Sequence, residues 1–319
     1  MQIEIVTPAA AGSTAGNRIT AERWAKILHE LGHSVSISRR YEGSSPDILV
    51  ALHARHSHSS MVRFRRHHPR GPVVLALTGT DVYRDLQRNA RARKSLDLAN
   101  RIIVLQPYAL RELTAKERKK ARVIYQSVAR LPVQKKPRRA AVGDHFEICV
   151  VGHLRPVKDP FRAAMAARQL PGSSRLRINQ VGRALSKSLE RRAQREMQIN
   201  RRYRWLGELS RARAWRVMAQ SRLCVISSRM EGGANVLSEA IVAGVPALAS
   251  RIDGNVGILG ENYPGLFRFG ETAELRKLLL RAEADPQFLK DLGRRIKPLA
   301  PLFNPVREKR AWAGLLAEL

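Results

Sequence analysis

Short runs rich in Val and Ile alternate with longer amphipathic segments along most of the chain, and this alternation restricts the fold more than any other feature. In the first part of the sequence, such runs predict six β-strands: 2–6, 34–38, 47–52, 73–77, 101–105 and 122–125. Between the first two, the apolar residues of 19–31 recur at helical spacing, and Gly32 follows where a left-handed cap residue belongs. Strand–helix–strand units connect parallel strands, so the pattern predicts an α/β fold with a doubly wound sheet.

The stretch 129–144 interrupts this alternation, because it combines two prolines with five basic residues and shows little periodicity. Such a stretch is typical of an exposed linker. After it the alternation resumes and predicts a second set of elements: strands 146–151, 176–181, 203–206, 222–227 and 246–249, and helices 160–169, 184–198, 211–221 and 236–243. We therefore predict two similar α/β domains, 1–128 and 145–303, joined by this linker.

The terminal segment, 304–319, has one apolar face, formed by Trp312, Leu315, Leu316 and Leu319. No later residue of the sequence could cover that face. We therefore expect the segment to be a helix that docks on earlier structure.

The composition fits two ordinary domains and indicates anionic partners. The 319 residues are 44% hydrophobic, and 58 Lys plus Arg against 27 Asp plus Glu give a formal charge of +31, which concerns partners and not fold. The two cysteines, Cys149 and Cys224, lie inside apolar runs, which predicts buried thiols and no disulfide framework. A strand stands where a signal peptide would begin, and no stretch approaches the ~20 apolar residues that span a bilayer. We expect a cytoplasmic protein without a membrane span.

The excess charge is spread over several regions. Residues 183–222 hold 12 Lys/Arg and three acids, a net of +9, and residues 111–139 hold 11 and two, again +9. In the first region Leu185, Leu189 and Met197 recur at helical spacing, which predicts a helix with a solvated basic face and an apolar core side. Nucleic-acid binding is disfavoured, because the chain has only 17 aromatic residues and no recognition module. A positive field that attracts small polyanions is the simpler interpretation.

The most informative stretch is 227–240, Ser-Ser-Arg-Met-Glu-Gly-Gly-Ala-Asn-Val-Leu-Ser-Glu-Ala. It follows a predicted strand, turns at two glycines and enters a helix, whose free N–H groups and dipole favour a diphosphate. Glu231 and Glu239 are eight positions apart, and a carboxylate there can accept hydrogen bonds from the two hydroxyls of a ribose or sugar. Solvated glutamates on a capped helix are the alternative. The continuation, 241–250, ends the helix at a glycine and enters a buried strand.

A second candidate site follows the strand predicted to end at Val151. The turn that comes next is Gly-His-Leu-Arg-Pro-Val-Lys-Asp-Pro, residues 152–160. Arg155 and Lys158 thus lie after a strand end, where open α/β sheets bind ligands. A forked guanidinium and an ammonium together suit a diphosphate. A plain surface pair of cations is the alternative.

Three segments of the first domain also follow predicted strands. They are the glycine-rich loop 8–18, which matches neither the Walker nor the dinucleotide pattern, and the segments 52–55 and 77–81. Polar residues after consecutive parallel strands gather at one edge of the sheet, so we predict an anion-binding site there. Its candidate residues are Gly12, Ser13, Asn17, His53, Arg55, Thr78, Gly79, Thr80 and Asp81. For each of them a local turn or helix cap is the alternative.

We expect no metal and no cofactor. His53, His56 and His58 lack an accompanying acid or thiol, so a solvated basic face explains them better than metal ligation. The sequence also has no Asp-x-Asp pair of the kind that holds a metal–diphosphate complex.

The stretch 231–246 resembles the signature of retaining nucleotide-sugar glycosyltransferases of the GT-B fold: Glu, seven residues, Glu, then Ala-x-x-x-Gly-x-Pro. This resemblance implies two Rossmann-like doubly wound domains facing a cleft, with a C-terminal helix, 304–319, that packs back on the N-terminal domain. It implies that Glu239 binds the nucleotide ribose and that Glu231 lies beside the donor sugar.

The same resemblance implies that Arg155 and Lys158 neutralise the leaving nucleoside diphosphate, so that Arg155, Lys158 and Glu231 are the catalytic candidates. The sequence has Lys158-Asp159 where many relatives have Lys-Gly, so we expect this turn to differ locally. The other residues expected to bind the nucleotide sugar are Gly207, Gly233, Ala234, Asn235, Val236 and Leu237.

Segments from residue 2 to the terminal helix resemble the selenosugar synthases of selenoneine biosynthesis. They include Leu-Thr-Gly-Thr-Asp-Val-Tyr, Val-Ile-Tyr-Gln-Ser, Gly-His-Leu-Arg-Pro-Val-Lys-Asp-Pro and Glu-Gly-Gly-Ala-Asn-Val. This resemblance implies transfer of a hexosyl group from UDP-N-acetylglucosamine (UDP-GlcNAc) or UDP-glucose to the selenium of selenophosphate, with a 1-selenosugar as product, by a monomer or weak homodimer. Selenophosphate is already an anion, so its selenium needs no general base. Two other readings stay open: a glycosyltransferase with a hydroxyl or lipid-linked acceptor, and a basic nucleic-acid-binding protein.

Overall fold

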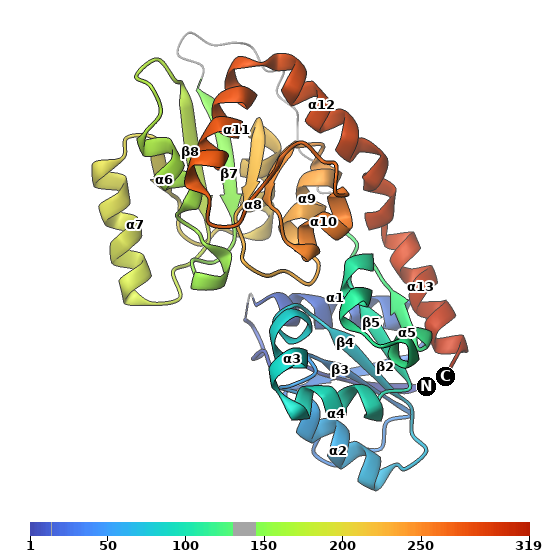
Figure 1. Cartoon of the computed structure of the whole chain (residues 1–319). Helices are drawn as coiled ribbons and strands as arrows, with labels where there is room; N and C mark the ends of the chain where they lie inside the picture. Colours follow the sequence, from blue (N-terminus) through green and yellow to red (C-terminus); the bar gives the residue numbers. More distant parts are fainter. Residues whose placement is uncertain (14, 130–144) are drawn as a thin grey trace. The chain divides into compact units, whose positions relative to one another are not determined.

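The computed structural model describes residues 1–13, 15–129 and 145–319. The described chain forms two compact units, which we call unit 1 (Met1–Ser127, Glu231–Asn235 and Leu302–Leu319) and unit 2 (Val128–Met230 and Val236–Pro301). Each unit contains a parallel six-stranded sheet with helices, so the predicted α/β fold with two doubly wound sheets is confirmed (Figure 1). The predicted linker, 129–144, lies outside the described residues except for Ala129.

Unit 1 has the strand order β2-β1-β3-β4-β5-β6. Its strands are β1 (Gln2–Val6), β2 (Ser34–Ser38), β3 (Ile48–Leu52), β4 (Val73–Leu77), β5 (Arg101–Val104) and β6 (Ala121–Val123). Its α-helices are α1 (Gly16–Glu30), α2 (His58–His67), α3 (Leu86–Arg88), α4 (Ala90–Leu98), α5 (Ala115–Lys119) and α13 (Pro305–Ala317). A π-helix, η1 (Asp81–Asp85), and a 3-10 helix, η2 (Pro107–Glu112), complete the unit.

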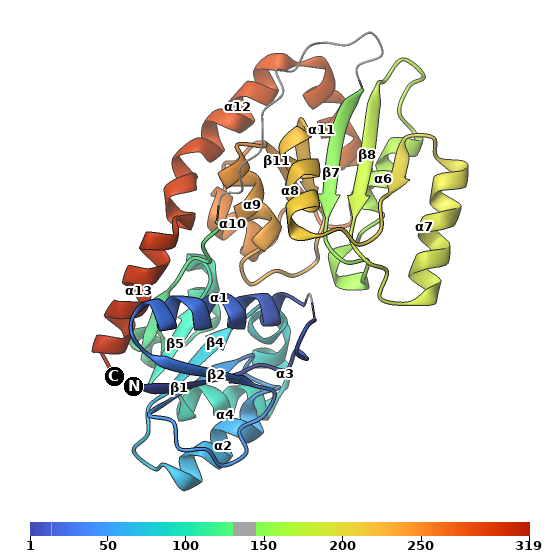
Figure 2. The same cartoon turned by 180° about the vertical axis from the view of Figure 1, so that it is seen from behind.

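The central strands of unit 1, β1, β3, β4 and β5, are nearly continuous in apolar residues and are buried on both faces, whereas the edge strand β2 is partly exposed. Ile3 and Ile5 of β1 pack in one core with Trp24 of α1, while Val6 packs in the other core with Phe64 of α2. Figure 2 shows α1 and α13 on one side of this sheet and α2 and α4 on the other. Helix α1 ends before Gly32, whose φ of 86° confirms the predicted left-handed residue.

The terminal helix α13 packs on α1 within unit 1. Trp312 is fully buried, and its ring meets that of Trp24 edge to face with the centroids 5.0 Å apart. Glu308 is also buried, and its carboxylate accepts hydrogen bonds from Trp24 Nε1 at 2.8 Å and from the Ser127 backbone N–H at 2.7 Å. Leu319, expected on the apolar face, is 36% exposed because the helix ends at Ala317.

Unit 2 has the strand order β12-β11-β10-β7-β8-β9. Its strands are β7 (Phe146–Val151), β8 (Leu176–Val181), β9 (Tyr203–Trp205), β10 (Leu223–Ile226), β11 (Ala247–Ser250) and β12 (Leu266–Phe267). Its α-helices are α6 (Arg162–Arg168), α7 (Lys187–Ile199), α8 (Arg211–Gln220), α9 (Asn235–Ala243, with Asn235 in unit 1), α10 (Asp253–Leu259), α11 (Thr272–Ala284) and α12 (Pro286–Ile296). The 3-10 helices η3 (Pro156–Lys158) and η4 (Lys297–Phe303) complete the elements. Within the described ranges, no helix is long and apolar enough to cross a membrane.

Helix α7 differs from its prediction. Leu185 and Met197, expected on the core side, are 47% and 38% exposed. The helix begins only at Lys187, so Leu185 precedes it, and the buried side is formed by Ala193 and Glu196. The Glu196 carboxylate pairs with the Arg168 guanidinium. A buried carboxylate paired with a partly exposed guanidinium thus stands where the spacing indicated an apolar stripe.

The prediction of buried cysteine thiols is confirmed. Cys149 on β7 and Cys224 on β10 are register partners in adjacent strands, and both are free and fully buried. Hydrogen bonding to Cys149, together with burial, raises the pKa of the Cys224 thiol. These thiols therefore belong to the core of unit 2.

Candidate functional site

The strand orders place a ligand-binding edge in each unit. In an open parallel sheet, ligands bind outside the carboxyl ends of the strands where the strand order reverses, the topological switch point. This reversal lies between β1 and β3 in unit 1, and between β7 and β10 in unit 2. We call these edges switch point 1 and switch point 2. Most segments with the sequence-predicted site residues follow these strands directly, whereas 78–81 follows β4 and Gly207 follows β9.

At switch point 2, the turn 155–159 is fixed to the segment that follows β10. Ser227 Oγ donates a hydrogen bond to the carbonyl oxygen of Asp159 at 2.8 Å. The Arg229 backbone N–H donates to the Val157 carbonyl at the same distance. Two segments that are 70 residues apart in the sequence are thereby held as one surface. Arg155 on it is exposed and Lys158 is half-buried, which is the exposure expected of ligand-binding cations.

Asp159, the residue that was expected to make this turn differ locally, has an unusual backbone conformation. Its φ is 43°, in the left-handed region that glycine enters at little cost and other residues seldom adopt. Arg162 Nε donates to the Asp159 carboxylate at 2.7 Å, and the same guanidinium donates to the Gly270 carbonyl at 2.6 Å. An ion pair thus holds Asp159 in a conformation that glycine would adopt unaided.

Beside switch point 2 the backbone of Gly152, Gly182 and Gly207 packs closely, and we call these three glycines the backbone floor. A Cβ added to Gly182, after β8, would lie 2.0 Å from the Gly152 carbonyl oxygen, after β7, so only glycine fits there. Gly182 N–H donates to the Gly207 carbonyl at 2.7 Å. Gly207, a predicted donor-site residue, follows β9, two strands away from β7. It joins the site through this backbone contact rather than at the switch point itself.

The predicted residues of helix α9 fall into two groups. Val236, Leu237 and Glu239 belong to unit 2. Glu239 and Val236 are half-buried, whereas the Leu237 side chain is fully buried and belongs to the core. A ligand contact from Leu237 therefore has to come from its backbone.

The preceding loop, Glu231–Asn235, belongs to unit 1 and contains the predicted residues Glu231, Gly233, Ala234 and Asn235. A Cβ on Gly232 would lie 2.5 Å from the backbone of Thr78, so this glycine is required by close packing. Glu231 is 9% exposed. Unit 1 thus gathers this loop and the segment 78–81 in one place.

At switch point 1, Asp81 joins the segments that follow β3 and β4. It is fully buried, and its carboxylate accepts hydrogen bonds from the backbone N–H groups of Thr78 (2.9 Å), Gly79 (2.8 Å) and Ala54 (3.0 Å). The Asp81 carboxylate thus holds the two loops together. The ligand contact expected of Asp81 stays a prediction.

His53 links the segments that follow β3 and β4. Its Nδ1 accepts the His56 backbone N–H at 3.4 Å. Its Nε2 lies 3.1 Å from Thr80 Oγ1, within hydrogen-bond distance. The His53 backbone has a φ of 77°, a strained value of the kind that clusters at functional sites.

Two charged residues of switch point 1, Arg84 and Asp85, were missed by the sequence analysis. Asp85 Oδ1 lies 3.0 Å from Arg84 Nε and 3.7 Å from Arg55 Nη1. Both residues end the π-helix η1, a rare element that is frequent at functional sites. The available signal was their spacing, since Asp85 follows Asp81 by about one helical turn.

The loop between β1 and α1 carries the remaining acceptor candidates. Gly12 is exposed with a φ of 71°, and Asn17 lies in the first turn of α1. The helix begins after Ala15, whose side chain gives no cap. The Ser13 hydroxyl is buried and finds no hydrogen-bond partner among the described residues. The loop therefore offers hydrogen-bonding groups at the same edge as His53.

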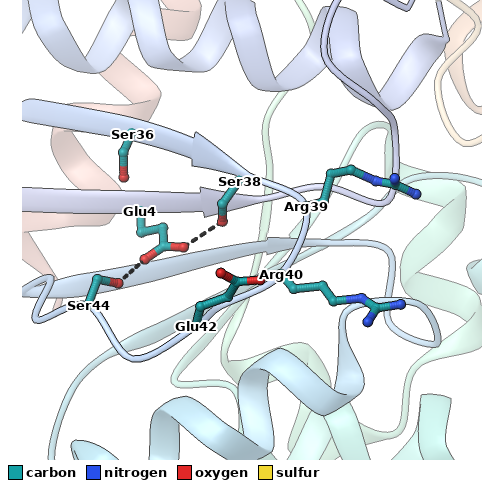
Figure 3. Close-up of a pocket in the computed structure, with 7 residues that line it drawn as sticks. All are labelled: Glu4, Ser36, Ser38, Arg39, Arg40, Glu42 and Ser44. Atoms are coloured by element: carbon teal, nitrogen blue, oxygen red, sulfur yellow. Dashed lines mark hydrogen bonds between the residues drawn. The ribbon is translucent and has the colours of Figure 1, made fainter.

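A hollow elsewhere in unit 1 contains none of the predicted residues. It has a volume of about 660 Å³ and is lined by Glu4, Ser36, Ser38, Arg39, Arg40, Glu42 and Ser44. Figure 3 shows that the hydroxyls of Ser38 and Ser44 both bond to the Glu4 carboxylate, while Arg39 and Arg40 extend away from it. The carboxylate is thus satisfied internally.

Among the residues that the structure describes, no group of three or more His, Cys, Asp or Glu is placed to hold a metal ion. The expectation that the protein works without a metal or cofactor stays a prediction.

Comparison with known proteins defines the class of the molecule. Residues 133–298 match the model of the glycosyl transferases group 1 family, and this match spans more than half of the chain. The protein therefore belongs to the glycosyl transferases group 1. A search of curated proteins finds no match.

Solved structures agree on the fold. HepE of Anabaena, in complex with UDP and glucose, is 19% identical over 100% of both chains, with a TM-score of 0.77. Sucrose-phosphate synthase of Thermosynechococcus elongatus is 17% identical over 99% of this chain and 98% of its own, with a TM-score of 0.78. At these identities the likeness concerns the fold, which is that of GT-B glycosyltransferases.

Proposed function

We propose that the protein transfers a hexosyl group from UDP-GlcNAc or UDP-glucose to the selenium of selenophosphate, as a step toward a 1-selenosugar. The observation that carries this proposal is the contrast between the two switch points. One combines two cations with a glycine-lined backbone floor. The other combines two partly exposed arginines, Arg55 and Arg84, with hydroxyl groups around two buried aspartates.

The donor is assigned to unit 2. Arg155 and Lys158 would bind the diphosphate of UDP, and Glu239 would accept hydrogen bonds from the ribose hydroxyls. The complex of Anabaena HepE with UDP and glucose supports a UDP-sugar as donor for this fold. As the bond between the anomeric carbon and the diphosphate breaks, the two cations would stabilise the charge that develops on UDP.

The acceptor is assigned to switch point 1. A hydroxyl acceptor needs a group that removes its proton, whereas switch point 1 presents two partly exposed arginines, Arg55 and Arg84, which suit an anion. An acceptor that arrives as an anion has no such need. Selenium would supply the electron pair for the new carbon–selenium bond, and UDP would leave with the electron pair of the old carbon–oxygen bond. Water must then cleave the selenium–phosphorus bond and release phosphate before the free selenosugar is formed.

The test is direct product analysis. Purified protein is incubated with each UDP-sugar and selenophosphate. The products are then analysed by mass spectrometry, in which selenium-containing compounds are recognised by the isotope pattern of selenium. We expect a selenium-containing hexose product and UDP, with both absent for Glu239→Ala. A neutral alcohol or lipid-linked alcohol that proves the better acceptor would contradict the selenium assignment. Failure to bind UDP, with steeply salt-dependent binding to long nucleic acids, would contradict the donor as well.

A further inference from the structure

Asp85 is a buried carboxylate with unusual surroundings. It is 3% exposed, and its Oδ2 has no hydrogen-bond partner in the described part of the chain. Three donors surround it: Arg84 Nε at 3.0 Å, Arg55 Nη1 at 3.7 Å and His53 Nε2 at 3.9 Å. A buried charge is costly unless it is paired, so this carboxylate depends on its two guanidinium neighbours.

The two guanidiniums, unlike the Asp85 carboxylate, are only partly buried. The side chains of Arg55 and Arg84 are 46% and 45% exposed, so each touches Asp85 on one side and solvent on the other. An arginine has five N–H donors, and a single carboxylate uses few of them. The remaining donors of both arginines are available to a ligand. Asp85 cancels one of the two positive charges, so the pair keeps a net positive charge at switch point 1.

We propose that Arg84 and Arg55 form a paired guanidinium clamp for the phosphate group of the acceptor, and that Asp85 is the positioning residue that holds the pair. Arginine suits this task, because its planar fork matches the oxygens of a phosphate-type anion. The Thr80 hydroxyl lies 3.1 Å from His53 Nε2 and offers a further hydrogen-bonding group beside the clamp. This inference rests on the proposed function, since it concerns the same acceptor site.

A general positive field is the competing explanation, and it makes opposite predictions. If net charge alone captured the anion, every arginine nearby would count equally, and removal of the Asp85 charge would tighten binding. If the clamp captures the anion, the position of Arg84 matters, and loss of Asp85 weakens binding although the net charge rises by one.

The experiment measures the binding of inorganic thiophosphate to the full chain without any UDP-sugar, by phosphorus NMR titration. The variants are Arg84→Ala, Asp85→Asn and, as a matched control, Arg88→Ala, which removes an exposed arginine four residues further on. We expect Arg84→Ala to weaken binding about tenfold or more, as for the loss of a charge-assisted hydrogen bond. Asp85→Asn should also weaken it, and Arg88→Ala should change it less than about twofold.

The clamp is refuted if wild-type protein does not bind thiophosphate, if Arg84→Ala equals Arg88→Ala, or if Asp85→Asn binds more tightly. Should Asp85→Asn fail to fold, the comparison of Arg84→Ala with Arg88→Ala decides alone. The circular dichroism spectrum and the melting temperature of each variant serve as the check on folding, because UDP binding is assigned to unit 2 and these residues lie in unit 1. The proposed function is judged separately by product analysis: a protein with this binding pattern that makes no selenosugar has the clamp but another acceptor.

Discussion

The two switch points lie at the same position in two similar sheets, but one is formed chiefly by backbone groups and the other by side chains. Switch point 2 is made chiefly of backbone: a glycine that tolerates no Cβ, a turn fixed by main-chain hydrogen bonds, and two cations placed on it. Switch point 1 is made of side chains around two buried aspartates, Asp81 and Asp85. Under the proposed function, the backbone-rich site binds the nucleotide, and the charged side chains of the other site bind the acceptor.

The largest expected effect tests whether the units are energetically separate. Trp312→Ala should destabilise unit 1 by about 3–5 kcal/mol, because it removes a fully buried ring packed on Trp24. If the units are energetically separate, UDP binding by unit 2 should survive at temperatures where unit 1 of this variant has unfolded. Thermal unfolding followed by circular dichroism measures the first effect, and UDP titration the second.

Val306→Ala is the control for this prediction, since Val306 lies on the same helix and is 55% exposed. It should change stability by no more than about 0.5 kcal/mol. An unchanged melting temperature for Trp312→Ala would show that α13 contributes little to unit 1.

The second prediction concerns the cations of switch point 2. Arg155→Ala should weaken UDP binding about ten- to a hundredfold, since a charge-assisted hydrogen bond contributes about 1.5–3 kcal/mol. Thiophosphate binding should stay the same. Isothermal calorimetry with both ligands measures this. Arg183→Ala is a matched control, because Arg183 is an exposed arginine at the end of the neighbouring strand β8 and lies 3.9 Å from Glu208. Equal losses in the two variants would argue for a diffuse field in place of a defined diphosphate site.

The third prediction concerns the backbone floor. Gly182→Ala should cost about 1–3 kcal/mol of stability, because its Cβ would lie 2.0 Å from the Gly152 oxygen at a φ of 141°. UDP affinity should fall as the strand ends separate. Gly172→Ala is the control, since its Cβ would meet nothing within 4 Å. Chemical denaturation gives the stabilities. A fully stable Gly182→Ala protein with normal UDP affinity would contradict the idea of a rigid floor.

The same contrast explains what could be predicted from the sequence. The strands and the fold class follow from local periodicity, and residues 227–246 carry their pattern within 20 consecutive positions, so switch point 2 was visible in the sequence. Asp85 was not, because its meaning depends on Arg55 and His53, which are 30 and 32 positions earlier and meet it only in the folded sheet. Helical spacing indicated that Leu185 is buried, but α7 begins only at Lys187 and Leu185 is exposed. Strand β12 was missed because its two residues are too few to form a periodic pattern.

The most direct test of the account is a crossed measurement of Michaelis constants in two variants, Arg55→Ala at switch point 1 and Glu239→Gln at switch point 2. Arg55→Ala should raise the KM for selenophosphate about tenfold and leave that for the UDP-sugar unchanged, because it removes a charged donor from one site only. Glu239→Gln should do the reverse. Added salt should weaken selenophosphate capture in the wild type, and less so in Arg55→Ala, because part of that capture is electrostatic. If either variant changes both constants alike, or if Arg55→Ala leaves the KM for selenophosphate unchanged, the assignment of one substrate to each switch point is wrong.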